Sequence, residues 1–217
     1  MHLPGCGNPC LAASPRAETA MTINDIVTDY IREYRDDAGA EMDTFRRERS
    51  RASAIRRAAL CEFPDGKRHP HQYLIPQRLF ELAEERLQAA ARRLAGAPDF
   101  DALHEIVKRE IGSVHGIGKL MVYDIAHRIG AYLGKVPTLV YLHRGTKEGA
   151  TILGFRGETL DPAVLPSAFA RLTPAEIEDC LCIYKDKLGG APGPSASQFR
   201  VRCCKASTTL CHVILGP

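Results

Sequence analysis

The sequence has 217 residues, of which 45% are hydrophobic and 25% charged, and its formal net charge is +3. This composition is ordinary for a globular chain, and the absence of any run of about 18 apolar residues excludes a hydrophobic transmembrane helix. The small net charge excludes nucleic-acid binding driven by bulk charge, so such binding has to come from local basic patches.

The two ends of the chain carry no periodic hydrophobic pattern. Residues 1–20 lack an apolar run long enough for a signal peptide and are predicted to be a disordered extension, with Met21 as an alternative start. Residues 189–217, rich in Gly, Pro and Ser and then in Cys, are predicted to be a disordered tail. The eight cysteines are irregularly spaced, which does not suit a disulfide framework and predicts a reduced, cytoplasmic protein.

The region 21–188 is predicted to be one helical domain that begins with two helices. Thr22 is placed to cap the first, whose apolar residues recur at helical spacing. The second is predicted over Ala38–Leu60 and carries a run of arginines: Arg46, Arg47, Arg49, Arg51, Arg56 and Arg57. The run either grips phosphate or forms a solvated face that is balanced by Glu41, Asp43 and Glu48.

Three more helices are predicted in the middle of the chain. A polar loop at 64–71, with His69 and His71, precedes a third helix at Pro76–Leu94. A metal site at these histidines lacks further ligands of suitable type nearby. Asp99 or Asp101 caps a fourth helix that ends at Ile111, and a fifth runs from Lys119 to Leu133 and stops at Gly134.

The last part of the domain mixes one short extended segment with helices. Residues 137–142 are apolar and β-branched, which indicates a short strand or a buried connector. Helices are then predicted at Gly145–Leu153, at 161–172 and from the capping box Thr173-Pro-Ala-Glu176 to Leu188. Three acids, Glu176, Glu178 and Asp179, are interpreted as first-turn acids that the helix dipole favours. The predicted fold is therefore mainly α, a multi-helix bundle.

The segment between the fourth and fifth helices is the most informative stretch for function. It contains Gly116-Ile117-Gly118, followed by Lys119 at the start of a helix. The glycines permit a tight turn with unusual φ angles, and the isoleucine is predicted to fill the small core between the helices. The N–H groups at the start of the fifth helix have no helical partner and form an anion site, for which a nucleic-acid phosphate is the expected anion.

This pattern resembles the helix-hairpin-helix motif, over about Leu103 to Gly134, which binds the DNA or RNA backbone without reading sequence. The resemblance implies that the N–H groups of Gly116, Gly118 and Lys119 face a phosphate and that hairpin carbonyls hold a monovalent cation. Ser113 and His115 are placed to add hydrogen bonds. One departure is Val122, where many members of the family have alanine. The alternative is an ordinary turn between core helices.

The stretch Lys135-Val-Pro-Thr-Leu-Val-Tyr-Leu-His143 is also similar to the segment that follows the hairpin in DNA glycosylases of the helix-hairpin-helix superfamily. There it leads into a catalytic aspartate, but here Val140, Tyr141 and Leu142 occupy that neighbourhood and no carboxylate is present. The resemblance therefore favours a protein that binds nucleic acid over an enzyme that cleaves it.

A second candidate anion site lies at 143–147. It combines Arg144, Thr146 and Lys147 with a predicted helix start, so the expected function is sequence-independent nucleic-acid binding, DNA preferred, at Ser113, His115, Gly116, Ile117, Gly118, Lys119, Arg144, Thr146 and Lys147. An enzyme that processes nucleic acid or nucleotides with His143 as general base is one alternative, and a helical interaction module is another. We expect no bound cofactor beyond the hairpin cation, and no membrane partner.

Overall fold

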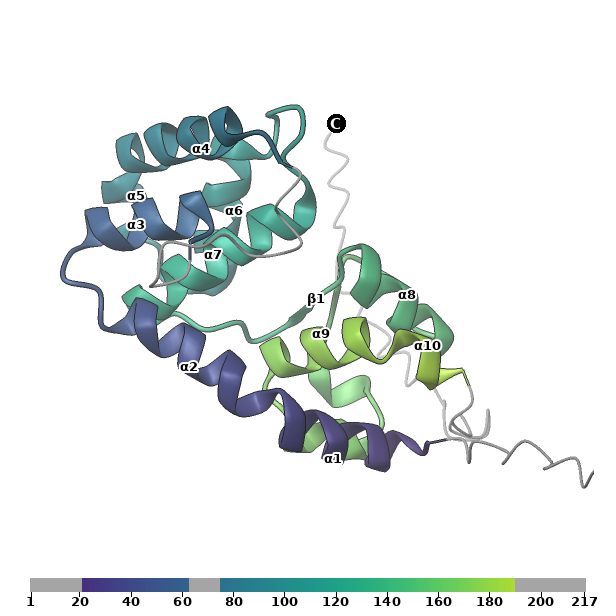
Figure 1. Ribbon diagram of the computed structural model, residues 1–217. Helices are drawn as coiled ribbons and strands as arrows, with labels where there is room; N and C mark the ends of the chain where they lie inside the picture. Colours follow the sequence, from purple (N-terminus) through teal and green to yellow (C-terminus); the bar gives the residue numbers. More distant parts are fainter. Residues whose placement is uncertain (1–20, 63–74, 190–217) are drawn as a thin grey trace, which may run out of the picture.

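The computed structural model describes residues 21–62 and 75–189, which form two helical lobes (Figure 1). The first lobe contains α2 (Arg35–Arg46), α3 (Arg51–Leu60), α4 (Gln77–Ala89), α5 (Ala91–Ala95), α6 (Phe100–Ile111) and α7 (Lys119–Leu133). The second lobe contains α1 (Ile23–Glu33), β1 (Val140–Tyr141), α8 (Arg144–Ile152), β2 (Thr159–Leu160), the 3₁₀ turns η2 (Pro162–Val164) and η3 (Ser167–Arg171), α9 (Pro174–Ile183) and α10 (Lys185–Leu188).

Each lobe has its own hydrophobic core. The first core gathers apolar side chains from α2 to α7, including the fully buried rings of Phe45, Phe80 and Phe100. The second core gathers side chains from α1 and from residues 140–188, including Ile26 and Phe169. The predicted domain is therefore one helical fold with two separate centres of packing.

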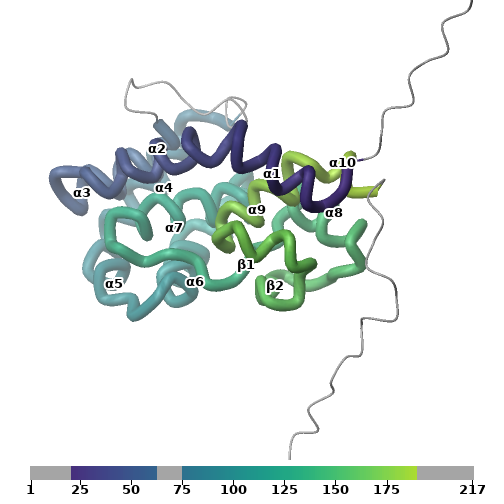
Figure 2. The backbone as a smooth tube through the Cα atoms, turned by 90° about the horizontal axis from the view of Figure 1, so that it is seen from below, coloured from purple at the N-terminus to yellow at the C-terminus, as the bar shows by residue number. Residues whose placement is uncertain are grey.

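The N-terminal helix belongs to the lobe that the C-terminal half of the chain builds. Helix α1 packs against η3 and α9, and the Tyr184 hydroxyl donates a hydrogen bond of 2.7 Å to Asp29 of α1. Just after α1, the Arg35 guanidinium lies 2.6 Å from a Glu176 carboxylate oxygen. Figure 2 shows from below how α1 lies along the second lobe before α2 leads across to the first.

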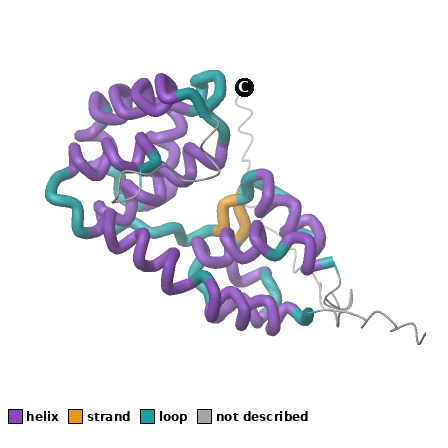
Figure 3. The backbone as a smooth tube through the Cα atoms, viewed as in Figure 1, coloured by secondary structure: helices purple, strands orange, loops and turns teal. Residues whose placement is uncertain are grey.

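The mainly helical fold and the short extended segment are confirmed. Strand β1 pairs antiparallel with β2, with Val140 opposite Leu160, and this small ribbon lies between the lobes (Figure 3). The predicted caps are present as well: Thr22 and Thr173 form capping boxes, and Asp99 accepts a hydrogen bond of 2.8 Å from the Ala102 N–H. Helix α7 begins and ends where predicted, with Gly134 at φ +68°.

Two predicted long helices are each divided into two. The helix predicted over Ala38–Leu60 stops at Arg46 and restarts at Arg51, because the Ser50 side chain caps α3 by accepting a hydrogen bond from the Ser53 N–H. The helix predicted over Pro76–Leu94 breaks at Ala90, between α4 and α5. The helical spacing of apolar residues continues through both breaks in the sequence, so this spacing did not predict either break.

The last two predicted helices are also shorter than expected. The segment 161–172 forms two 3₁₀ turns, because Pro166 has no N–H with which to continue a helix from η2. The final helix breaks at Tyr184 and resumes as α10. No helix among the described residues is both long and apolar enough to cross a membrane. The predicted disordered segments 1–20 and 189–217, apart from Gly189, and the loop with His69 and His71 lie outside the described residues.

Candidate functional site

Helices α6 and α7 pack together and are joined by the turn 112–118. Gly116 adopts φ +96°, a conformation that strains any other residue, and a Cβ there would lie 2.7 Å from Leu79 Cδ1. The Ile117 side chain is buried in the first core, which confirms that it fills the space between the helices. Gly116 and Gly118 are exposed, so the backbone of this turn faces outward.

The N-terminus of α7 is open on this side. Gly118 is its N-cap residue and has no side chain to cap the helix. The N–H groups of the first turn therefore have no hydrogen-bond partner within the helix. Lys119 is exposed, and Ser113 and His115 are exposed on the preceding turn. The partial positive charge of the helix end and the charge of Lys119 therefore lie on the same exposed surface, where both attract anions.

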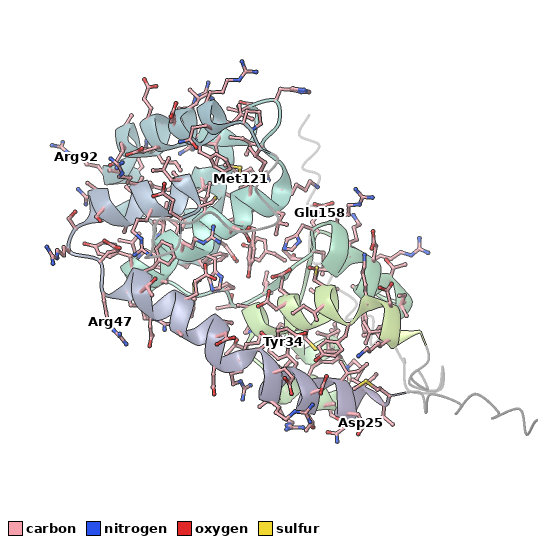
Figure 4. All side chains as sticks on the ribbon, in the orientation of Figure 1. Asp25, Tyr34, Arg47, Arg92, Met121 and Glu158 are labelled. Atoms are coloured by element: carbon pink, nitrogen blue, oxygen red, sulfur yellow. The ribbon has the colours of Figure 1, made fainter. Side chains whose placement is uncertain are left out.

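Glu158 links this turn to the start of α8. Its carboxylate lies 2.6 Å from the Lys119 ammonium and 3.4 Å from that of Lys147. The hydrogen bond from Lys119 is the main cause that lowers the pKa of Glu158 below its usual value. Figure 4 shows Glu158 near the junction of the lobes. The structure thus brings together the hairpin and part of the 143–147 site, with an acid between the two lysines.

The rest of the 143–147 segment divides into an exposed and a buried part. Arg144 and Lys147 are exposed, and Arg144 is 97% accessible. Thr146 is fully buried and donates a hydrogen bond of 2.5 Å to a Glu178 carboxylate oxygen. Its assignment to the anion site is therefore wrong, because its hydroxyl has no access to a ligand at the surface.

His143 is buried beside the same acid. Its Nε2 atom lies 2.8 Å from Glu178 Oε1 and has no other partner among the described residues. Burial lowers the pKa of His143, but the hydrogen bond with Glu178 and the charge of that carboxylate outweigh it and raise the pKa above its usual value. His143 and Glu178 are therefore close partners, and both side chains are almost completely buried.

This buried pair exists because α8 and α9 approach very closely. A Cβ on Gly149 would meet the Leu181 carbonyl oxygen, so this position requires glycine, and one on Gly145 would lie against Cys182 Sγ, which would have to move aside. Gly145 was predicted to serve a helix start that binds an anion. Its role in the structure is to let α8 pack onto α9.

The acids at 176–179 do not share one role. Glu176 completes the capping box and pairs with Arg35, as expected of a first-turn acid. Glu178 is buried, and Asp179 lines a cavity and accepts a hydrogen bond of 3.3 Å from the Tyr30 hydroxyl. Burial, followed by the charge of Glu178, raises the pKa of Asp179 to about 7. The interpretation of Glu178 and Asp179 as first-turn acids is wrong, because they lie beyond the first turn of α9, where Glu176 is the acid.

The cavity that Asp179 lines has a volume of about 440 Å³ and lies between the lobes; we call it the interlobe cavity. Its polar lining was missed in the sequence: Tyr123, Asp124, His127 and Arg128 of α7. The available signal was their spacing, since polar groups at i and i+4 in an otherwise apolar helix share one face. Burial lowers the pKa of His127 to about 4, so this imidazole is neutral at pH 7.

A second cavity of about 420 Å³ lies beneath the hairpin turn, and we call it the hairpin cavity. Gly118, Lys119 and Glu158 form part of its wall, and Tyr123 lines it as well as the interlobe cavity. Tyr123 is thus common to the linings of the two cavities.

The arginine run is largely engaged with the protein itself. Arg46 and Arg47 pair with Asp43, while Arg57 pairs with Glu48 and stacks over the Phe45 ring at 4.6 Å. Arg49, Arg51 and Arg56 are exposed. Internal balance by acids thus accounts for half of the run, as one of the two interpretations expected.

Within residues 21–62 and 75–189, no group of three or more His, Cys, Asp or Glu side chains is arranged to hold a metal ion, and Cys61, Cys180 and Cys182 are free thiols. Comparison with protein-family models, curated proteins and solved structures finds no match to this chain. Its function therefore has to be inferred from geometry and charge.

Proposed function

We propose that the protein binds nucleic acid, DNA preferred, through the phosphate backbone and without reading sequence. The observation that carries the proposal is the exposed, uncapped start of α7, with Lys119 on it and Lys147 held nearby by Glu158. Helix N-termini and lysines both attract phosphate, and each phosphate that is neutralised releases counterions.

Glu158 acts as an internal competitor for the two lysines. Its carboxylate and both ammonium groups are largely exposed. Exposed ion pairs of this kind contribute little to stability, so a nucleic-acid phosphate can replace Glu158 at low cost. The affinity of this surface is therefore set partly by an acid that can be removed without disturbing the fold.

Neighbouring groups assist the same surface. Ser113 and His115 are exposed on the turn, and Arg144 extends from the start of α8. Ile117 contributes through its backbone only, because its side chain is buried. A bound monovalent cation has no part in the proposal.

Catalysis by the 143–147 segment has less support. His143 is 6% exposed and its Nε2 atom lies 2.8 Å from Glu178, whereas Arg144 and Lys147 are exposed. A general base has to reach the proton that it abstracts, within about 3 Å or through one water molecule. The exposed part of this segment carries cations suited to holding an anion.

The test is a salt titration of binding to short duplex DNA by fluorescence anisotropy. We expect Lys119→Glu to weaken binding about tenfold and to reduce the salt slope by about 1, because one phosphate contact is lost. We expect Glu158→Gln to strengthen binding, because both lysines then face the phosphate without a competing acid.

Two control variants make the same charge changes elsewhere. Arg92→Glu alters the far edge of the first lobe, away from Met121 and Glu158 (Figure 4). Glu33→Gln removes another exposed, paired acid, on α1. Both should bind DNA nearly as the parent does. Absence of binding at low salt, or a Lys119→Glu variant that binds as well as the parent, rejects the proposal.

A further inference from the structure

The interlobe cavity is large enough for a small organic molecule. Its volume of about 440 Å³ lies within the usual range for ligand sites, and its walls come from α2, α7, the connector at 136–137 and α9. Because these elements belong to both lobes, a molecule bound there would contact each of them.

Part of the cavity wall is apolar. Met42, Val136 and Pro137 line it, together with Ala38 and Gly39 of α2. A Cβ added at Gly39 would have no heavy atom within 4 Å, so the space beside this stretch of α2 is open. These side chains suit the hydrocarbon or aromatic body of a ligand.

Carboxyl groups outnumber guanidinium groups in the lining of the cavity. Five carboxyl groups and three guanidinium groups line it: Glu41, Asp124, Glu176, Glu178 and Asp179, and Arg35, Arg46 and Arg128. Each arginine has an acid partner, since Arg35 pairs with Glu176, Arg128 with Glu41 and Arg46 with Asp43. His127 adds no charge at neutral pH. Every arginine that lines the cavity is therefore already paired with a carboxylate, which disfavours binding of an anion.

A second feature points to a ligand. The Tyr123 hydroxyl is buried and has no hydrogen-bond partner among the described residues, although such groups are almost always paired. Its ring is held by Tyr141 and His143, at centroid distances of 5.3 and 5.4 Å. Tyr123 lines the interlobe cavity, and burial, followed by the charges of Glu178 and Asp179, raises its pKa well above the usual value.

We propose that the interlobe cavity binds a small organic cation, an amine or amidine on an apolar body, through N–H groups that bond to Asp179 and the Tyr123 hydroxyl. The Asp179 carboxylate supplies the negative charge, and the neutral hydroxyl oxygen accepts a second N–H. The apolar wall of Met42, Val136 and Pro137 covers the body of the ligand. This proposal is independent of nucleic-acid binding at the hairpin.

The ionisation of Asp179 gives the binding a pH dependence. With a pKa of about 7, Asp179 is partly protonated at neutral pH, and a bound cation favours its charged form. Binding should therefore release protons near pH 7 and strengthen as pH rises to 8. The groups that face Asp179 are Tyr30 of α1, Glu41 of α2, Tyr123 and Asp124 of α7, His143 before α8 and Glu178 of α9.

The experiment is isothermal titration of the full chain with three probes of one shape: benzamidine, benzamide and benzoate. We expect saturable binding of benzamidine, with the neutral and anionic probes at least about tenfold weaker. The heat of benzamidine binding at pH 7 should differ between buffers of different ionisation enthalpy, which reports the released protons. Tighter binding of benzoate, or no saturable binding of benzamidine below about 10 mM, overturns the proposal.

Variants locate the site. Asp179→Asn should weaken benzamidine binding at least about tenfold and abolish the buffer dependence. Tyr123→Phe keeps the ring and removes only the unpaired hydroxyl, so it should fold normally and bind several-fold more weakly. Glu158→Gln removes an acid that lines the hairpin cavity instead and should leave benzamidine binding unchanged. Unaltered binding by both Asp179→Asn and Tyr123→Phe contradicts the assignment to this cavity.

Discussion

Glu178 and Asp179 are neighbours in α9, yet their surroundings give them different chemistry. Glu178 has an imidazole, His143, and the Thr146 hydroxyl as partners. Asp179 accepts a hydrogen bond of 3.3 Å from the Tyr30 hydroxyl and lies beside the Glu178 carboxyl group. Hydrogen-bond donors stabilise the charged form of a buried carboxyl group, whereas a neighbouring negative charge opposes its ionisation. Burial and the neighbouring Glu178 charge thus place the pKa of Asp179 at about 7, where its charge changes near neutral pH.

This difference predicts how stability depends on pH. The pKa of Asp179 is about 7 in the fold and 3.8 ordinarily, so between these values the folded state binds more protons than the unfolded state. The contribution of Asp179 to stability is therefore full below pH 4 and is lost as pH rises through 7. We expect Asp179→Asn to raise the free energy of unfolding at pH 8 by about 2 kcal/mol, measured by urea denaturation.

Measurements at pH 4 provide the comparison, because Asp179 is then protonated in the folded state and resembles the amide. The gain from Asp179→Asn should shrink toward zero there. Asp186→Asn, which changes an exposed acid of α10, should have little effect at either pH. A gain of equal size at pH 4 and pH 8 would show that ionisation of Asp179 is not its cause.

At the scale of elements, the helix ends were the most predictable feature. Side chains within three residues of an end decide it, as with Thr22 at α1, Asp99 at α6 and Thr173 at α9. The breaks at Ser50 and Ala90 were missed because apolar spacing alone does not register them. The close packing of α8 on α9 was missed for another reason: Gly145 and Gly149 acquire meaning only once the facing helix is known.

The α8–α9 contact predicts a large effect of a small substitution. A Cβ on Gly149 would overlap the Leu181 carbonyl oxygen, which is backbone and cannot move aside without shifting α9. We therefore expect Gly149→Ala to lower the free energy of unfolding by about 2–3 kcal/mol, although alanine favours helix formation. The measurement is chemical denaturation monitored by circular dichroism.

Gly39→Ala is the matched control, since Gly39 also lies inside a helix and has open space where a Cβ would be. This variant should gain about 0.5–1 kcal/mol from reduced backbone freedom. If both variants changed stability in the same direction by similar amounts, helix propensity would explain them and the close approach of α8 to α9 would not.

At the scale of the whole molecule, the chain crosses between the lobes twice. Helix α1 enters the second core, α2 leads into the first lobe, and the connector after α7 returns to β1 (Figure 1). The second lobe thus cannot complete its core from residues 140–188 alone, because α1 supplies Ile26, Val27 and Tyr30, all fully buried. The interlobe cavity is a consequence of this path.

Separate cores predict separate local stabilities. Ile26→Ala removes a fully buried side chain from the second core, a change that typically costs about 2–5 kcal/mol. We expect hydrogen exchange to show faster exchange of amides in α8 and α9, with α4 and α6 much less affected.

Leu103→Ala makes a comparable change in the first core and should produce the reverse pattern. If either variant accelerated exchange equally in both lobes, the two cores would form a single cooperative unit.

The sequence by itself determined the helical class, most helix ends, the turn around Gly116 and the burial of Ile117. These depend on residues close together in the chain, whose capping and apolar spacing act locally. Nucleic-acid binding at that turn stays a prediction. Only the tertiary structure decided that Thr146 is buried, that Lys119 and Lys147 meet at Glu158, and that Asp179 and Tyr123 face one cavity. Those relations join residues of different helices, and local patterns do not encode which faces meet.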